Sequence, residues 1–260
     1  MQDNQALLFS VIDGCLAAFR PSVIFDVGAR DGKESIEFAQ KFPAARVFAF
    51  ECHPDLLPRC KAALSQYPRI ELAPFAVSKH SGTIPFYPID HARSRVKSPD
   101  GNPGASSILR ASGKYPSESY VQSETAVPSV RLDDFCDRRQ LSHPDLIWMD
   151  IQGAELEALQ SLGARLDRAS LMHIEVEFME IYSGQPLFRD IRAFLRGKGW
   201  TFAGFTSYSR YFADAIFVNA RLVDEAAIAC ARERLHTSRA MRKYWRHEVK
   251  RRLRSWIGAG

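Results

Sequence analysis

The chain lacks the features that mark secreted, disulfide-rich or membrane-spanning proteins. No uninterrupted apolar stretch approaches the roughly 20 residues that a membrane helix needs. Residues 1–6 also lack the basic segment that opens a signal peptide. The cysteines are scattered and form neither a CxxC pair nor a cluster with histidine: Cys15, Cys52, Cys60, Cys136 and Cys230. These absences predict a cytoplasmic, reducing compartment, no disulfide framework and no structural zinc.

Glycine is sparse at the one place where a dinucleotide-binding site would need it. Residues 23–32, VIFDVGARDG, contain Gly28 and Gly32, whereas the dinucleotide fingerprint has three glycines in G-x-G-x-x-G. The short apolar run before Gly28 is typical of a buried parallel strand, and glycines after it let the backbone approach a ligand closely. The segment therefore lacks the third glycine of the loop that binds a pyrophosphate, which disfavours a nicotinamide-dependent oxidoreductase.

A carboxylate ends the next predicted strand, residues 46–51, which follows a helical pattern over residues 33–41. At that position of a doubly wound sheet, Glu51 can accept hydrogen bonds from both hydroxyls of a ribose. Asp26 and Asp31 would suit a positively charged cofactor without phosphate. S-adenosylmethionine fits this description, and an ordinary strand–turn–helix followed by a chance glutamate is the alternative.

The rest of the chain continues the alternation of strands and helices, which predicts an α/β fold. Residues 1–20 form a packing helix, residues 21–220 the main domain and residues 221–260 a C-terminal helical extension. Further strands are predicted over residues 70–77, 145–150 and 171–177, then a helix over 186–197 and a strand pair over 200–205 and 214–219.

Residues 88–128 are the least regular stretch and hold five of the 14 prolines. A loop of this length in a compact domain is more often functional or mobile than a simple connection, so we expect a substrate loop. Its basic residues, Arg93, Arg95, Lys97, Arg110 and Lys114, would suit a substrate phosphate. A solvated lid is the alternative.

Seven segments together resemble the FkbM family of S-adenosylmethionine-dependent methyltransferases over roughly residues 20–220: Asp26–Gly32, Phe50–Pro54, Ala76–Val77, Gly104–Ser107, Val130–Asp134, Asp150–Glu155 and Asp214–Val218. The resemblance implies the Rossmann-like methyltransferase fold, a mostly parallel sheet of seven strands with the last strand antiparallel and helices on both faces. It also implies methyl transfer, usually to oxygen on sugars. The chain departs from the family at Arg30, commonly Asn, and at Gln152, commonly Glu.

Matching positions assign the cofactor contacts. The resemblance puts Asp26, Gly28, Ala29 and Gly32 beside the methionyl and backbone side of the cofactor, and Glu51 at its ribose. Ala76 and Val77 border the adenine, and Ser107 completes the cofactor-binding set.

Candidate catalytic groups lie at or near the ends of later strands. Asp150 is the first candidate for a general base, and Glu155 follows one helical turn later. His173 and Glu175 share one face of a strand with Glu177, and Glu175 is a second candidate base. Asp150 and Glu175 could also hold Mg²⁺ through oxygen ligands. The alternatives are that Asp150 and Glu155 only hydrogen-bond the backbone and that His173 is a structural core residue.

The positive charge of the chain belongs to its tail. Residues 221–260 hold 11 Lys and Arg against 4 Asp and Glu, whereas the remainder holds 24 against 26. Apolar residues recur in the tail every three or four positions, at Met241, Trp245, Val249, Leu253 and Trp256. This basic amphipathic helix could lie on an anionic inner-membrane surface, dock on the body or pair with a second subunit. Nucleic acid is a less favoured partner, because no base-stacking module accompanies the charge.

These patterns predict an O-methyltransferase that acts on a hydroxyl of a sugar, nucleotide sugar, glycan or glycosylated metabolite. The alternative is a noncatalytic methyltransferase-like module that binds or assembles through its basic tail.

Overall fold

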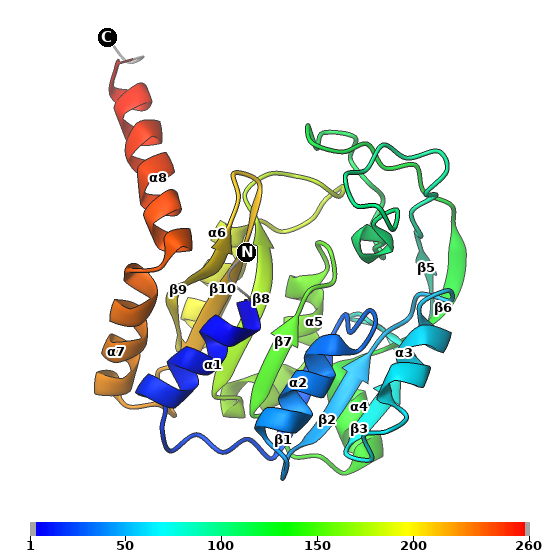
Figure 1. Ribbon diagram of the computed structural model, residues 1–260, viewed down its shortest axis with the longest axis horizontal. Coiled ribbons are helices and arrows are strands. Elements are labelled where there is room, and N and C mark those ends of the chain that lie inside the picture. Colours follow the sequence, from blue (N-terminus) through cyan, green and yellow to red (C-terminus); the bar gives the residue numbers. More distant parts are fainter. Residues whose placement is uncertain (1–3, 258–260) are drawn as a thin grey trace.

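The computed structural model describes residues 4–257, with side chains described through Lys250. Within them a seven-stranded sheet has the order β3-β2-β1-β7-β8-β10-β9 (Figure 1). β3, β2, β1, β7 and β8 pair in parallel. β10 runs antiparallel to both β8 and β9, so β9 has the same direction as the first five strands. The strands are β1 (Val23–Val27), β2 (Arg46–Phe50), β3 (Ile70–Ala73), β7 (Leu146–Met149), β8 (Leu171–Glu177), β9 (Trp200–Tyr208) and β10 (Phe212–Asn219). The predicted fold class is confirmed.

Helices cover both faces of this sheet, so its central strands are buried on both sides and read as continuous apolar runs. One apolar layer lies under α1 (Asn4–Cys15), α2 (Lys33–Lys41), α3 (Leu57–Leu64) and α7 (Glu225–His236). The other lies under α4 (Leu132–Arg139), α5 (Glu155–Ser161), the 3₁₀ turn η2 (Gly163–Arg168) and α6 (Phe188–Gly197). The two layers fix the strand ends on which a site can be built.

Strand order reverses at the centre of the sheet. The chain runs from β1 outward through β2 to β3, then returns to place β7 on the other side of β1. The carboxyl ends of β1 and β7 therefore diverge into a crevice, which is where ligands bind in open α/β sheets.

The strand predicted over residues 70–77 is two strands in two different sheets. Pro74, which has no N–H to donate, follows β3, and the chain then leaves the main sheet. Ala76–Val77 form β4, which pairs with β6 (Thr125–Val130), and β5 (Gly82–Phe86) pairs with β6 from its other side. A small three-stranded sheet thus stands beside the main one (Figure 1).

The irregular stretch predicted over residues 88–128 ends earlier, because its last residues belong to β6. Before β6 it contains a short 3₁₀ turn, η1 (Pro103–Ala105), and isolated bridges. Side chains tie it to the sheet: the Tyr182 hydroxyl donates to the Ala105 carbonyl at 2.7 Å, and Ser107 Oγ donates to the Gln152 carbonyl at 2.8 Å. The stretch is therefore fastened above the carboxyl ends of the strands.

Two cysteines are joined, contrary to the expectation of no disulfide. Cys15 at the end of α1 bonds to Cys230 in α7 across 215 residues of sequence. The pairing arises because α1 and α7 pack against each other, which scattered spacing along the sequence could not reveal. Cys52, Cys60 and Cys136 are free.

The C-terminal helix α8 (Arg239–Ile257) begins on the body and then leaves it (Figure 1). Ala240 and Met241 are buried in the core beside β9, whereas Trp245 and Val249 are 42% and 53% exposed. The side chains of Leu253 and Trp256, predicted to continue the apolar face, lie outside the described residues. Within residues 4–257, no helix is long and apolar enough to cross a membrane.

Candidate active site

A cavity of about 310 Å³ opens at the carboxyl ends of β1, β2, β7 and β8. Its floor is the crevice at the reversal of strand order, and residues 102–108, 115, 118 and 120 of the irregular stretch form its opposite wall. Seven of the sequence-predicted site residues line it.

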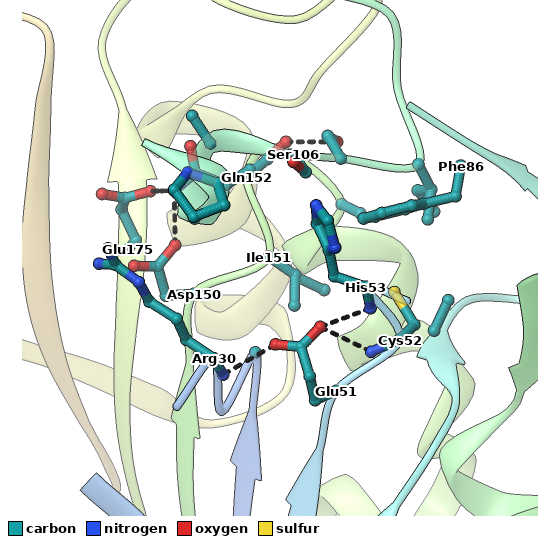
Figure 2. A pocket seen from close by; sticks show the side chains of 18 of the residues that line it. Arg30, Glu51, Cys52, His53, Phe86, Ser106, Asp150, Ile151, Gln152 and Glu175 are labelled. Atoms are coloured by element: carbon teal, nitrogen blue, oxygen red, sulfur yellow. Dashed lines mark hydrogen bonds between the residues drawn. The ribbon is translucent and has the colours of Figure 1, made fainter. Parts of the chain in front are cut away.

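Glu51 lies at the end of β2 with both carboxylate oxygens held by backbone amides (Figure 2). Oε1 accepts from the N–H groups of Cys52 at 2.7 Å and His53 at 2.6 Å, and Oε2 accepts from the N–H of Arg30 at 2.8 Å. Burial raises the pKa of Glu51, and the same three amides oppose that rise. Three of the four acceptor positions are thus filled, and the remaining lone pair, on Oε2, can accept from a ligand hydroxyl.

Gly28 allows two strand ends to meet. Its φ is 94°, and a Cβ at this position would lie 1.9 Å from the Asp150 carbonyl oxygen. The amides of Gly28 and Ala29 both donate to the Phe50 carbonyl, at 3.0 and 2.9 Å. The turn therefore brings bare backbone to the cavity floor, and no other residue type fits at Gly28 without displacing the end of β7.

An apolar slot adjoins Glu51. Phe75, Ala76, Val77 and Ile151 line it, and His53 packs edge-on against Phe86 with ring centroids 5.7 Å apart. Burial lowers the pKa of His53, which keeps its ring neutral near pH 7. A flat, uncharged ring attached to a diol fits this combination of slot and carboxylate.

On the other side of Gly28, one amide joins two carboxylates (Figure 2). Gln152 Nε2 donates to Asp150 Oδ1 and to Glu175 Oε2, both at 2.6 Å, while Gln152 Oε1 lies 2.8 Å from the Tyr182 hydroxyl, whose single hydrogen it shares with the Ala105 carbonyl. Gln152 has φ 57°, so the turn after β7 aims its amide back across the strand ends.

Burial among the cavity walls raises the pKa of Asp150 and holds the pKa of Glu175 well above its usual range. The nearby charge of Asp150 raises the pKa of Glu175 further, whereas a hydrogen bond from Glu175 lowers that of Asp150. Asp150 thus ionises first. Its side chain is accessible from the cavity, so a ligand that expels water would strengthen the effect of burial.

Within residues 4–257, no group of three or more His, Cys, Asp or Glu is arranged to hold a metal ion. Between Asp150 and Glu175 lies the Gln152 amide nitrogen, a donor, and a cation there would require Gln152 to turn away. Magnesium at these two residues stays a prediction.

Seven of the predicted site residues line the cavity: Gly28, Glu51, Ala76, Val77, Ser107, Asp150 and Glu175. Asp26, Ala29 and Gly32 lie behind the glycine turn. Asp26 is buried in β1 and accepts from Ser35 Oγ at 2.5 Å, and burial raises its pKa to about 8. Gly32, with φ 81°, begins α2 against Leu64. These three residues shape the turn, and none of them faces the cavity.

Glu155 and His173 do not reach the cavity. Glu155 is fully buried at the start of α5, where Oε1 accepts from the amides of Ile151 at 3.0 Å and Gly153 at 3.2 Å. Burial raises its pKa to about 7. It braces the turn that carries Asp150 and Gln152, which is the structural alternative that the sequence left open.

His173 lies about 7 Å further down β8 than Glu175, because each strand residue rises about 3.3 Å. Its ring stacks on Trp148 with centroids 3.8 Å apart, and its Nε2 lies 2.7 Å from Thr206 Oγ1. Burial lowers its pKa to about 3. His173 is therefore a neutral core residue, and its assignment as catalytic is corrected.

Sequence reasoning missed several residues of the cavity wall. Tyr115, Glu118 and Tyr120 come from the irregular stretch, where no periodic pattern marks them. Arg30 and Gln152, which the sequence marked only as departures from the family, also line the cavity, and both have positive φ. The five basic residues predicted for a phosphate do not line the cavity, and three of them pair with carboxylates: Arg93 with Asp90, Arg110 with Glu124 and Lys114 with Glu180.

Comparisons with known proteins agree with this geometry. The sequence matches the Methyltransferase FkbM domain over residues 26–202. It is 33% identical over 172 residues to the 2-O-methyltransferase NoeI of Sinorhizobium fredii (strain NBRC 101917 / NGR234), an alignment that covers 65% of this chain and 69% of that protein.

Two solved structures are similar in outline. A putative O-methyltransferase from Klebsiella pneumoniae has a TM-score of 0.47 and 12% identity, covering 85% of this chain and 82% of its own. The magnesium protoporphyrin IX methyltransferase of Synechocystis PCC 6803 has a TM-score of 0.44 and 14% identity, covering 84% and 79%. The family match, which includes both the glycine turn and the Asp150 turn, establishes that this chain belongs to the FkbM methyltransferases and is an S-adenosylmethionine-dependent enzyme.

Proposed function

We propose that the protein transfers a methyl group to a hydroxyl oxygen of a sugar unit. The observation that carries this proposal is the pair of carboxylates, Asp150 and Glu175, held at the cavity mouth by Gln152 next to the glycine turn. The similarity to a protein named as a 2-O-methyltransferase supports oxygen as the acceptor atom.

The residues present fit S-adenosylmethionine. Gly28 leaves a cradle that a Cβ would fill, Glu51 offers a fixed carboxylate to a ribose diol, and Phe75, Ala76, Val77 and Ile151 line a slot for adenine. When bound, the cofactor supplies a methyl group on positively charged sulfur, which an oxygen nucleophile can attack. The carboxylates of the cavity favour such a cation.

Asp150 is the group best placed to take the proton of the acceptor hydroxyl, because it ionises before Glu175 and is accessible from the cavity. Burial and the nearby charge of Asp150 hold the pKa of Glu175 well above its usual range, and in its protonated form Glu175 can donate a hydrogen bond to the acceptor. Gln152 holds both side chains in place, so the chain's contribution is position and proton transfer.

The wall contributed by the irregular stretch suits a sugar ring. Tyr115 and Tyr120 line the cavity, and Glu118 accepts hydrogen bonds from the Tyr120 hydroxyl at 2.8 Å and from Asn102 Nδ2 at 3.1 Å. Aromatic faces pack on the C–H face of a sugar, and carboxylates bind its hydroxyls.

Cytoplasmic location and use of Mg²⁺ remain proposals. The Cys15–Cys230 disulfide removes one premise of the cytoplasmic location, the expected absence of disulfides.

The test is methyl transfer from labelled S-adenosylmethionine to a panel of methyl glycosides, each paired with its deoxy analogues. We expect label to enter one glycoside, and not the analogue that lacks the receiving hydroxyl. Transfer to amine acceptors alone would contradict the proposal. So would the absence of transfer to any hydroxyl in a protein that binds S-adenosylhomocysteine.

A further inference from the structure

Helix α8 carries two large apolar side chains, Trp245 and Val249, that the body leaves exposed. Its first turn is anchored: Met241 is buried, and Tyr244 packs partly buried against the core. One turn on, Trp245 and Val249 lie four positions apart on the same side of the helix and are 42% and 53% exposed. In the sequence Leu253 and Trp256 continue this spacing. We call these four residues the α8 stripe.

Strong positive charge flanks the stripe. Residues 239–257 contain eight Lys and Arg and one acid, Glu248. The five basic residues with described side chains are exposed, and among the described residues none of them forms an ion pair: Arg239, Arg242, Lys243, Arg246 and Lys250. Residues 1–220, by contrast, hold slightly more acids than bases. The charge is therefore segregated on the element that projects from the body (Figure 1).

We infer that α8 is a docking surface for an anionic lipid bilayer, with the α8 stripe at the boundary of headgroups and acyl chains and the basic residues among the headgroups. A helix that combines exposed tryptophan and aliphatic side chains with a strongly basic flank binds such an interface through apolar burial and electrostatic attraction. This inference goes beyond the proposed function and does not depend on the acceptor.

The same observations disfavour two other occupants. A second copy of the chain, packed stripe to stripe, would bring together two helices that each carry eight Lys and Arg against one acid. A nucleic acid would neutralise the charge but leave Val249 uncovered, because phosphates do not bury an aliphatic side chain.

The experiment is flotation of the full-length protein with vesicles of phosphatidylcholine alone and of phosphatidylcholine mixed with phosphatidylglycerol. We expect at least about tenfold more bound protein with the anionic vesicles, a loss of binding as salt rises, and a blue shift of tryptophan fluorescence. Equal binding to both kinds of vesicle, or to neither at low salt, overturns the inference.

The variant Trp245→Asp/Val249→Asp tests the stripe. It should lose most of the binding to anionic vesicles, whereas Leu222→Asp, which alters another exposed apolar residue outside α8, should retain it. Affinity for S-adenosylhomocysteine should stay the same in both variants, which shows that the body is folded.

Unchanged vesicle binding by the double variant contradicts the inference. So does light scattering that shows the parent protein as a dimer and the double variant as a monomer. Tighter binding to RNA than to anionic vesicles would likewise overturn it.

Discussion

Asp150 and Glu175 accept hydrogen bonds from the same nitrogen atom, Nε2 of Gln152, at 2.6 Å each. They lie 25 positions apart in the sequence, and the pairing of β7 with β8 brings their strand ends side by side. Two carboxyl groups held this close do not ionise independently, and the charge of Asp150 helps to raise the pKa of Glu175.

This arrangement makes Asp150 more important for the rate than for cofactor binding. Asp150→Asn should lower kcat/KM by about 10²- to 10⁴-fold, the usual contribution of a general base. Affinity for S-adenosylhomocysteine, measured by calorimetry, should change little. Glu155→Gln is the control: it should lower the melting temperature because Glu155 braces the turn, but it should cost far less activity at a permissive temperature. Equal losses of activity in the two variants would contradict the assignment.

The pH profile follows from the same pair. A base acts when it is deprotonated, and the pKa of Asp150 is raised, so kcat/KM should rise with pH over a range above that of an ordinary aspartate. Glu175→Ala removes a hydrogen bond that lowers the pKa of Asp150 and should move this limb to higher pH. A limb that stays in place after this substitution would show that the two groups do not interact.

Glu51 should govern affinity for the cofactor. Removing a charged acceptor of hydrogen bonds costs about 1.5 to 3 kcal/mol, so Glu51→Ala should weaken S-adenosylhomocysteine binding by about 10- to 100-fold. Since Glu51 also holds three backbone amides, Glu51→Gln serves as the second variant, because its amide oxygen can keep part of that network. A folded Glu51→Ala protein with unchanged affinity would refute the assignment to ribose.

Gly28 should be the least replaceable glycine. Gly28→Ala and Gly184→Ala both force alanine to positive φ, at 94° and 76°, but only the first puts a Cβ against backbone, 1.9 Å from the Asp150 carbonyl oxygen. The two variants therefore separate conformational strain from collision. We expect a clearly lower melting temperature and lost cofactor binding for Gly28→Ala alone. Similar melting temperatures for the two variants would contradict the close approach of β1 and β7.

Asp26 should make stability depend on pH. Its pKa is about 8 when folded against an ordinary value of 3.8, so between these values the folded chain binds the extra proton and the free energy of unfolding falls as pH rises. Asp26→Asn removes this dependence while keeping an acceptor for Ser35. The variant should gain melting temperature relative to the parent from pH 5 to pH 8, by about 2 to 4 °C for each kcal/mol. A constant difference across that range would contradict the raised pKa.

The Cys15–Cys230 bond should stabilise the packing of α1 on α7. Cys15→Ser should lower the free energy of unfolding by about 2 to 4 kcal/mol, and a reducing agent should do the same to the parent but not to the variant. Cys136→Ser, at a free buried cysteine, is the control that remains sensitive to the reducing agent. A parent protein whose melting temperature ignores reduction would contradict this expectation.

Much of the site was predictable because local patterns encode it. The apolar run of β1, the glycines after it and Glu51 after β2 each have a physical reason within a few residues of sequence. The same holds for Asp150, which ends an apolar strand. Where a residue's place depends only on its own strand end, the sequence was sufficient.

What depends on distant partners was not predictable. His173 has the right strand face but lies one pleat repeat too deep, and only the register of β8 beside β7 reveals this. Tyr115 and Tyr120 line the cavity from a stretch with no periodic pattern. Hydrogen bonds to Gln152 and Tyr182, which are distant in the sequence, fasten that stretch to the body. The Cys15–Cys230 pair likewise depends on helix packing over the whole chain.

The position of β10 in the sheet affects how the chain can fold while it is being synthesised. β10 lies between β8 and β9, although it is made after both, and α1, the first described element, completes its contacts only with α7. A nascent chain that has reached residue 202, the end of the family match, therefore still has an unpaired edge on β8 and an unsupported first helix. Unpaired edges invite pairing with other chains, so we expect the main sheet to be complete, and this edge protected, only after β10 has been made.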